Sequence, residues 1–191
     1  VYIKDHGKFE FLGGTLDDAA GEAFDKTARL VDISKYLGGV ALSNLAARCE
    51  KSDIEGRLPR PMITKEGFDF SFSGLKTAVK RLVENENHPR ESIAREFEDA
   101  VVDVLVAKTI EAALTKNVKS ILLGGGVSAN RTLRSRLQEE ATKNGFKLFV
   151  PPLRLCTDNA IYIASAAFFN RSATKMEDVK ANPSLTIMDQ V

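Results

Sequence analysis

The clearest candidate for chemistry in this sequence is a run of three glycines. The short apolar segment 121–123 is followed by Gly124, Gly125 and Gly126, and residues 130–145 then show helical periodicity. A buried strand that ends in a glycine loop before a helix leaves backbone N–H groups and the helix dipole pointing at whatever lies in the loop. Such loops bind phosphate groups, and a tight strand-to-helix turn without a ligand is the alternative.

The pattern around this loop limits the type of nucleotide site. Gly124, Gly126 and Ala129 match the loose dinucleotide-binding pattern G-x-G-x-x-G/A. A dinucleotide fold also needs an acid at the end of the next strand, where this chain has Pro151 and Pro152. The sequence contains no G-x-x-x-x-G-K-[ST], which excludes a P-loop NTPase. We therefore expect a mononucleotide-type site with Asn130 as a polar contact near the helix start.

Two aspartates are further candidates. Asp158 lies in the polar cluster 156–159 between an expected strand and an expected helix, where α/β proteins bind ligands and a carboxylate can hold a metal ion. The simpler interpretation is that the Asp158 carboxylate interacts favourably with the dipole of the helix that follows it. Asp25 lies beside the apolar stripe of an expected helix, and a surface acid is its simpler interpretation. His6 and His88 form no HxxxH or HExxH pair, so no zinc site is visible.

The elements that position these residues follow from periodicity. The sequence predicts a hairpin over residues 1–12 with Val1, Ile3, Phe9 and Phe11 facing inward, an amphipathic helix capped by Thr15, and a second helix over 40–50. Alternating Phe68, Phe70 and Phe72 predict a strand before a helix from residue 75, and one long helix covers 90–115. Residues 52–62, which contain RLPRP, predict an exposed basic connection.

The C-terminal part continues the same alternation. A strand is expected over 147–150, and a helix with an apolar face follows residues 157–159. We expect three regions: residues 1–12 as a hairpin, residues 13–172 as an α/β unit with a helical insertion, and residues 173–191 as an irregular tail.

Composition is ordinary for a globular protein, with 191 residues, 43% hydrophobic and 28% charged. Two cysteines and the absence of a long apolar run predict no disulfide framework, no membrane span and a cytoplasmic location. The net charge of +1 conceals an uneven layout, with seven Lys or Arg and two Glu in residues 119–154, and six acids and two bases in 91–111. A basic, polyanion-binding surface and solvated helix faces are the alternatives.

The motifs together resemble those of a known family. GGTLDDAAGEAFDKTARL, RPMITKEGFDFSFSGLKTAV, AREFEDAVVDVL, LLGGGVSANRTLR and PPLRLCTDNAIYIA are similar, in order and spacing from about residue 11 to residue 169, to the TsaD/Kae family of tRNA N6-adenosine threonylcarbamoyltransferases. The resemblance implies the fold of actin, sugar kinases and heat-shock ATPases (ASKHA), in which two α/β lobes close on a nucleotide. It implies that this chain holds the C-terminal lobe and the end of the N-terminal lobe.

The resemblance also implies site residues. The adenylate-binding Asp, Gly and Asn of the family match Asp25, Gly39 and Asn130, although the family usually has Pro-Gly-Gly where this chain has Leu37-Gly38-Gly39. The N–H groups of Gly125 and Gly126 would hold the phosphate. The metal-ligating Asp matches Asp158, and the resemblance places the other ligands of the iron or zinc ion, an HxxxH pair, in an N-terminal half that would precede Val1.

The activity implied is transfer of threonylcarbamoyl from threonylcarbamoyl-AMP to N6 of the adenosine beside the tRNA anticodon. The resemblance implies Fe²⁺ or Zn²⁺ as cofactor, and tRNA, a TsaB-like subunit and a TsaE-like ATPase as partners. Lys76, Arg131, Arg134 and Arg136 are candidates for tRNA backbone contact or for a solvated face. We expect this chain alone to be inactive. The alternatives are a non-catalytic nucleotide-binding or assembly module and a metalloendopeptidase.

Overall fold

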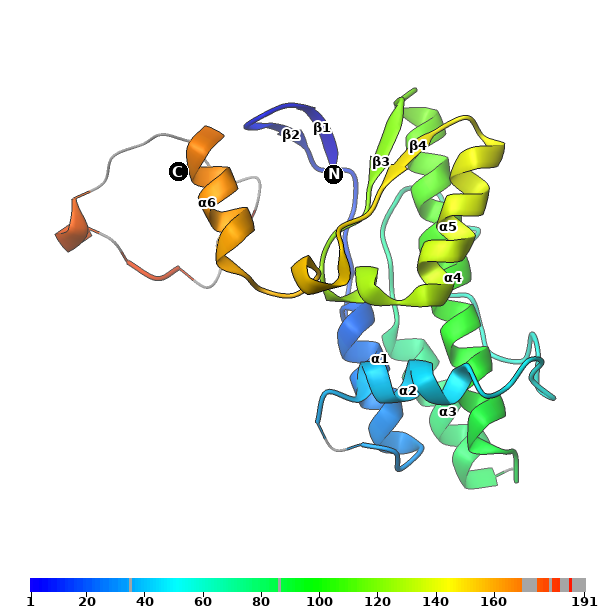
Figure 1. Ribbon diagram of the computed structural model, residues 1–191. Coiled ribbons are helices and arrows are strands. Elements are labelled where there is room, and N and C mark those ends of the chain that lie inside the picture. The colour runs from blue at the N-terminus through cyan, green and yellow to red at the C-terminus, as the bar shows by residue number, and fades with distance from the viewer. Residues whose placement is uncertain (35, 86, 170–174, 179, 183–185, 187–191) are drawn as a thin grey trace.

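The structure, a computed structural model, describes residues 1–34, 36–85, 87–169, 175–178, 180–182 and 186. It is an α/β fold in which helices predominate over two small sheets (Figure 1). In chain order the elements are β1 (Tyr2–Asp5), β2 (Lys8–Glu10), α1 (Ala20–Leu30), α2 (Gly38–Ala46), α3 (Ser73–Asn85), α4 (Arg90–Thr115), β3 (Ser120–Leu122), η1 (Gly126–Ala129), α5 (Arg131–Lys143), β4 (Lys147–Phe149), η2 (Leu153–Leu155), α6 (Ala160–Phe169) and η3 (Met176–Asp178).

The long helix α4 connects the two hydrophobic cores of the molecule. Its 26 residues cover the helix expected over 90–115. In Figure 1, α1, α2 and α3 surround its first half, whereas α5 and the strands β3 and β4 lie along its second half. Val101 and Val104 belong to the first core, and Val102 and Val106 belong to the second. Contacts with both cores therefore bury the helix on more than one side.

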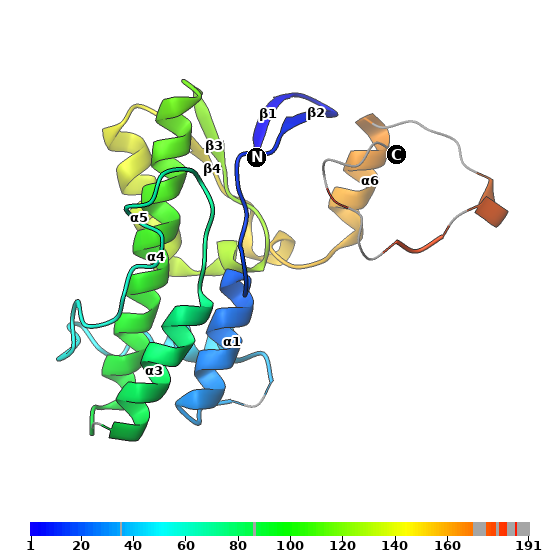
Figure 2. The same ribbon diagram turned by 180° about the vertical axis from the view of Figure 1, so that it is seen from behind.

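In the described part of the chain, the first core is built from helices and loops. Phe24 of α1 meets Phe97 of α4 edge to face, with ring centroids 5.1 Å apart. Leu75 and Val79 of α3 are completely buried in the same core, and Figure 2 shows α3 beside α1 and α4. The helices of this core pack against one another through their apolar faces. This packing supplies most of the stability of short helices.

The second core covers one face of a two-stranded parallel sheet. β3 pairs with β4, with Ile121 opposite Leu148. The connection between them is α5, whose Leu133, Leu137 and Ala141 are buried against α4 and the sheet. This β–α–β unit confirms the expected strands on both sides of the glycine loop.

Two predictions at the start of the first core are wrong. Phe68, Phe70 and Phe72 do not form a strand; Phe70 alone makes a bridge, pairing with Thr15. The amphipathic helix begins at Ala20 rather than near Thr15, and its N-cap residue, Ala19, makes no side-chain hydrogen bond. The hydroxyl of Thr15 instead donates to the carbonyl of Asp18 in a turn. These residues lie outside the helix because Asp17 caps a different helix.

Asp17 caps α3, which begins far from it in the sequence. Its carboxylate accepts hydrogen bonds from the backbone N–H groups of Phe72 (2.7 Å) and Ser73 (3.2 Å). The hydroxyls of Ser71 and Ser73 also donate to it. Burial raises the pKa of the Asp17 carboxyl, but these hydrogen bonds outweigh burial and hold it well below its ordinary value. An acid at a helix N-terminus is stabilising for the same electrostatic reason.

This cap predicts an acid-dependent loss of stability. Because the pKa of Asp17 is lowered in the folded state, its stabilisation is complete above the unfolded pKa near 3.8 and is lost as pH falls below that value. We expect Asp17→Asn, which removes the negative charge from the start of α3, to lower the free energy of unfolding by about 1 kcal/mol at pH 7. The difference from wild type should shrink below about pH 4 in urea unfolding. Glu55→Gln, in an exposed pair with Lys51, is the control and should change little.

The connection over residues 52–62 is irregular, as expected, but it is not simply exposed. Ile54 and Leu58 are buried in the first core. The side chain of Arg60 is only 19% exposed and forms ion pairs with Glu96 and Asp103 of α4. Further along the chain, the buried ammonium of Lys108 donates to the carbonyls of Lys65 and Gly67. Arg60 thus holds this connection against α4, and Lys108 of α4 holds the residues that follow it.

The hairpin and α6 lie beside the two cores (Figure 1). β1 and β2 pair antiparallel as predicted, but Val1, Ile3 and Phe11 are exposed rather than inward. α6 is exposed along its whole length, and His6 stacks on Phe169 with ring centroids 3.7 Å apart. Of the expected tail 173–191, only residues 175–178, 180–182 and 186 are described. No helix in the described part of the chain is long and apolar enough to cross a membrane.

Candidate functional site

The structure brings Asp25 and Gly39 together where α2 begins. Asp25 lies on α1, and its carboxylate accepts a hydrogen bond of 2.8 Å from the N–H of Gly39. The neighbouring Gly38 is required by packing, because a Cβ atom there would lie 2.3 Å from the Cβ of Ala28. A Cβ atom at Gly39 would meet only ordinary contacts of 3.5 Å or more. Packing within the chain therefore does not require glycine at position 39.

The entry to α2 has an unusual backbone. Leu37 precedes the helix with φ 49°, in the left-handed region, and its side chain is exposed. Proline cannot adopt this conformation because its ring fixes φ near −65°. The Leu37-Gly38-Gly39 sequence therefore enters the helix in a way that a Pro-Gly-Gly sequence cannot.

Asn130 is connected to the same region through α2. Its amide nitrogen donates to the hydroxyl of Ser43 at 3.0 Å, and Ser43 lies one helical turn beyond Gly39. The same nitrogen donates to the carboxylate of Glu98 at 2.6 Å. The side-chain oxygen of Asn130 accepts from the N–H of Leu133 and caps α5. Asp25, Gly39 and Asn130, which we call the helix-crossing site, thus border a region where α1, α2 and the start of α5 meet.

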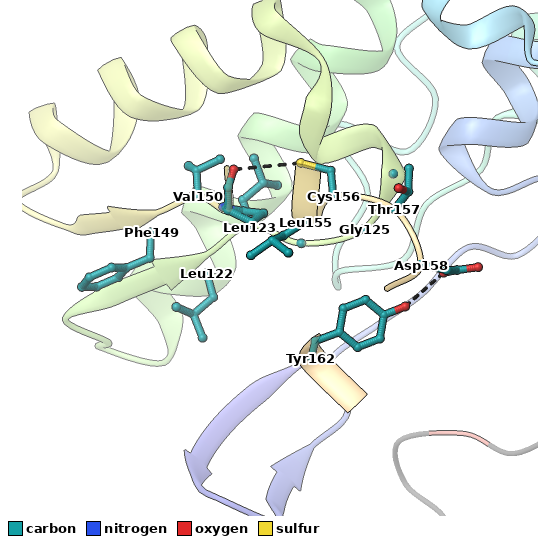
Figure 3. A pocket seen from close by; sticks show the side chains of 13 residues that line it. Leu122, Leu123, Gly125, Phe149, Val150, Leu155, Cys156, Thr157, Asp158 and Tyr162 are labelled. Carbon is teal, nitrogen blue, oxygen red and sulfur yellow. Dashed lines mark hydrogen bonds between the residues drawn. The ribbon is translucent and has the colours of Figure 1, made fainter. Parts of the chain in front are cut away.

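The glycine loop forms a separate cavity of about 720 Å³, the glycine-loop pocket (Figure 3). Gly125 has φ 84° and ψ 172°, a conformation open almost only to glycine. The loop does not lead directly into a helix as predicted, because the turn η1 intervenes and α5 begins at Arg131. Its wall is largely apolar, with a few polar groups at one end; it is lined by Leu122, Leu123, Gly124, Gly125, Gly126, Phe149, Val150, Pro151, Leu155, Cys156, Thr157, Asp158 and Tyr162.

Asp158 lies in the wall of this pocket. It is exposed, and its carboxylate accepts a hydrogen bond of 3.1 Å from the hydroxyl of Tyr162 (Figure 3). Asn159, not Asp158, caps α6 by accepting from the N–H groups of Ile161 and Tyr162. Across the described ranges, no group of three or more His, Cys, Asp or Glu side chains is arranged to hold a metal ion. The side chains described here therefore supply Asp158 as a single candidate ligand and do not form a metal site by themselves.

The predicted site residues thus fall into two neighbouring groups. Gly125, Gly126 and Asp158 line the glycine-loop pocket, whereas Asp25 and Gly39 meet at the helix crossing. The short turn η1 joins the two groups, because it begins at Gly126 and ends next to Asn130. The side chain of Asn130 is directed to α2 and α4 rather than to the pocket that Asp158 lines.

Several charged residues expected at the surface have internal partners instead. Arg136 of α5 pairs with Asp99 and Asp103 of α4, so the basic and acidic segments of the sequence partly neutralise each other. Hydrogen bonding to Asp99 raises the pKa of Arg95 further, although burial lowers it. Two of the other candidates for tRNA contact, Lys76 and Arg131, are exposed.

Arg134 holds the two walls of the glycine-loop pocket together. Its guanidinium donates to the carbonyl of Ser128 in η1 and, at 2.8 Å, to the carbonyl of Pro151. It also lies 3.1 Å from the sulfur of Cys156, a buried free thiol. Arg134 therefore contributes to the architecture of the pocket.

Glu98 is a site residue that sequence reasoning missed. It is 3% exposed, and its carboxylate accepts from Asn130 and from the hydroxyl of Thr132. A signal was present, because Ala94 and Val102, four residues before and after Glu98, are apolar and buried. An acid in an apolar row of a helix predicts a buried polar contact.

Comparison with known proteins agrees with this arrangement of motifs. A family model described as "TsaD: tRNA N6-adenosine threonylcarbamoyltransferase" matches residues 1–165, which includes the hairpin as well as the motifs of both cores. This chain belongs to the TsaD family. The match confirms the resemblance and extends it to the N-terminal hairpin.

Relatives in the TsaD family are similar throughout this chain. Proteins named tRNA N6-adenosine threonylcarbamoyltransferase from Bacillus cereus and Bacillus subtilis are 46% and 45% identical to it, and each alignment covers 98% of the chain. A protein of the same name from Persephonella marina is 44% identical over 92% of the chain. These alignments cover 56%, 55% and 51% of the relatives, so the chain spans about half the length of the curated relatives it matches.

Proposed function

We propose that this chain provides the adenylate-binding part of a tRNA N6-adenosine threonylcarbamoyltransferase. The proposed reaction transfers threonylcarbamoyl from threonylcarbamoyl-AMP to N6 of an adenosine in tRNA. Membership of the TsaD family supports the class of reaction. The contact between Asp25 and Gly39 is the single structural observation that carries the assignment of the nucleotide to this chain.

The geometry of this contact suits a nucleotide. Asp25 is half-buried and adjoins the exposed entry of α2, so its carboxylate is held in place by the Gly39 N–H while the entry stays open to solvent. A fixed acceptor of this kind can receive a hydrogen bond from a ribose hydroxyl or an amino group of the base. Glycine at position 39, which packing does not require, allows a ligand to approach the backbone closely. Gly125 and Gly126 are proposed to contact the phosphate.

At the level of the fold, we propose an ASKHA arrangement. Residues 13–172 correspond to the C-terminal lobe with its helical insertion, residues 1–12 to the end of the N-terminal lobe, and residues 173–191 to a tail. The parallel strands β3 and β4 with α5 and α4 support an α/β lobe. Residues 170–172 lie outside the described residues.

Asp158 is proposed as one ligand of an iron or zinc ion in the whole enzyme. A carboxylate suits such an ion, but Asp158 alone does not complete a tetrahedral or octahedral set. Its exposure in the wall of the glycine-loop pocket leaves room for ligands from elsewhere. A TsaB-like subunit, a TsaE-like ATPase and tRNA are the proposed partners, with Lys76 and Arg131 as candidates for phosphate contact.

A non-catalytic nucleotide-binding module is the second candidate function. The observation that favours it is the lone acid at position 158, because the described residues bring together no three His, Cys, Asp or Glu that could hold a metal. The same observation gives a metalloendopeptidase no support, because that reaction needs a complete metal site and a general base.

Nucleotide titration of the 191-residue chain tests the proposal. We expect ADP to bind with a dissociation constant below about 1 mM without added metal, and Asp25→Ala to raise this constant about tenfold, the loss of about 1.4 kcal/mol. Asp32→Ala, in the exposed turn that follows α1, is the control and should leave binding unchanged. Isothermal titration measures both. Absence of ADP binding in wild type, or equal binding by Asp25→Ala, would refute the assignment.

A further inference from the structure

The hydrogen bonds of Asn130 restrict what it can offer a ligand. Both hydrogens of its amide nitrogen are committed, one to Ser43 and one to Glu98. Its oxygen accepts from Leu133, which leaves one lone pair of that oxygen unused. Asn130 can therefore meet a ligand only as an acceptor unless it gives up one of these partners. A phosphate group, which is itself an acceptor, does not suit it.

Glu98 determines this orientation. It lies on α4, is almost completely buried, and presents one carboxylate oxygen to Asn130 at 2.6 Å and the other to Thr132 at 2.7 Å. An ionised carboxylate only accepts hydrogen bonds, so the Asn130 nitrogen must face it and the Asn130 oxygen must face Leu133. The hydrogen bond from Asn130 is short for its type, and the one from Thr132 has the usual length. Of its neighbours on α4 at helical spacing, Ala94, Val101 and Val102 are apolar, and Arg95 forms its ion pair with Asp99.

We propose that Glu98 is a positioning residue that fixes Asn130 as a hydrogen-bond acceptor for a donor group of the nucleotide, a ribose hydroxyl or the amino group of adenine. This inference rests on the proposed function, because it assigns Asn130 to the nucleotide site. Glu98 does not touch the ligand and acts through Asn130. Together with Ser43, it connects α4 and α2 to the residue that follows η1.

Substitutions at Glu98 have distinct expected effects. Glu98→Gln retains an oxygen for Asn130 and offers its amide nitrogen to the Thr132 hydroxyl, which also accepts hydrogen bonds. We expect it to bind ADP within twofold of wild type. Glu98→Leu leaves the half-buried Asn130 N–H and the Thr132 hydroxyl without this acceptor. We expect the ADP dissociation constant of Glu98→Leu to rise about tenfold, or 1.4 kcal/mol.

Glu96 offers a matched control on the same helix. It is also a completely buried acid, but it binds Arg60 and the N–H of Leu58 rather than Asn130. Glu96→Leu should lower the melting temperature and leave the ADP dissociation constant within twofold of wild type. If Glu96→Leu and Glu98→Leu weaken ADP binding equally, Glu98 has only a structural role and the proposal is refuted.

An exchange of donor and acceptor tests the pair directly with nearly isosteric changes, so it remains decisive if Glu98→Leu does not fold. Asn130→Asp places two carboxylates against each other and should weaken ADP binding. Adding Glu98→Gln supplies a donor to the new carboxylate and should restore binding, since the ligand still meets an oxygen at position 130. A double variant no better than Asn130→Asp would overturn the proposal.

A measurement without nucleotide separates this inference from the proposed function. If wild type does not bind ADP, the proposed function fails, and the side-chain NH₂ signals of Asn130 in ¹⁵N NMR then decide the positioning role. These signals should exchange slowly with solvent in wild type and in Glu98→Gln, and rapidly in Glu98→Leu. Equal exchange in wild type and Glu98→Leu would contradict the role of Glu98.

Discussion

Arg60→Met is expected to lower the free energy of unfolding by about 3–5 kcal/mol, because it leaves a buried carboxylate without its cation. The carboxylate is that of Glu96, which is 0% exposed and lies 2.5 Å from the Arg60 guanidinium. Its remaining hydrogen bond from the Leu58 N–H, 3.0 Å long, does not compensate for a buried negative charge. Burial lowers the pKa of Arg60, yet its hydrogen bonds to Glu96 and Asp103 raise it overall, so the guanidinium is charged. Urea unfolding at pH 7 measures the loss.

A second substitution distinguishes the lost charge pair from lost packing. Glu96→Gln removes the buried charge and keeps an acceptor for Leu58, so the Arg60→Met/Glu96→Gln chain should be only about 1–2 kcal/mol less stable than wild type. Asp103 keeps its ion pair with Arg136 in this variant. If Glu96→Gln restored no unfolding free energy to the Arg60→Met chain, the loss of stability would come from packing and the electrostatic explanation would be wrong. Lys51→Met, in an exposed pair, should cost less than about 1 kcal/mol.

Phe97→Ala is expected to cost about 3–5 kcal/mol of unfolding free energy, the usual loss for a large core side chain. Phe97 is completely buried in the first core and packs edge to face on Phe24. Its removal leaves a cavity between α4 and α1 that neither helix can close, because Ala23 and Ala28 of α1 are also buried there. The same measurement on Phe149→Ala, which removes a ring that is 54% exposed, provides the control.

The Phe97 variant also connects stability to the proposed site. Phe24 directly precedes Asp25, so the packing of these rings holds α1 where Asp25 meets Gly39. We expect Phe97→Leu, which fills most of the space, to lose about half as much stability as Phe97→Ala. A loss below about 1 kcal/mol for Phe97→Ala would show that α4 and α1 do not depend on this contact.

The opposite charges of α4 and its neighbours have a structural explanation. Acidic residues of α4 form ion pairs with arginines of two other segments. Arg60 of the irregular connection 52–62 pairs with Glu96 and Asp103. Arg136 of α5 pairs with Asp99 and Asp103. These pairs hold two elements that are distant in the sequence against one helix. Some basic residues that the sequence suggests for a basic surface are therefore paired with acids of α4 instead. The remaining exposed candidates, Lys76 and Arg131, are on different helices.

Most local elements and the family are predictable from the amino-acid sequence. The long helix at residues 90–115, the strands beside the glycine loop and the motifs of the TsaD family follow from periodicity and from short patterns, because local propensity and apolar spacing act over neighbouring residues. Predictions failed where a local pattern had a distant partner. Phenylalanines alternate with polar residues over 68–72 as in a strand, but of these only Phe70 forms a backbone bridge. Thr15 and Asp17 resemble a cap for α1, whereas Asp17 in fact caps α3.

Which side chains share a site depends on how distant elements pack together. The tertiary structure joined Asp25 to Gly39 and surrounded Asn130 with Ser43 and Glu98, and it placed Asp158 with the glycine loop in a separate pocket. The physical reason is that a carboxylate or an amide can be satisfied by any donor or acceptor that the fold brings within about 3 Å, and burial then makes the choice costly to change. Sequence spacing contains no information about such partners, since Asn130 and Ser43 are 87 residues apart in the chain.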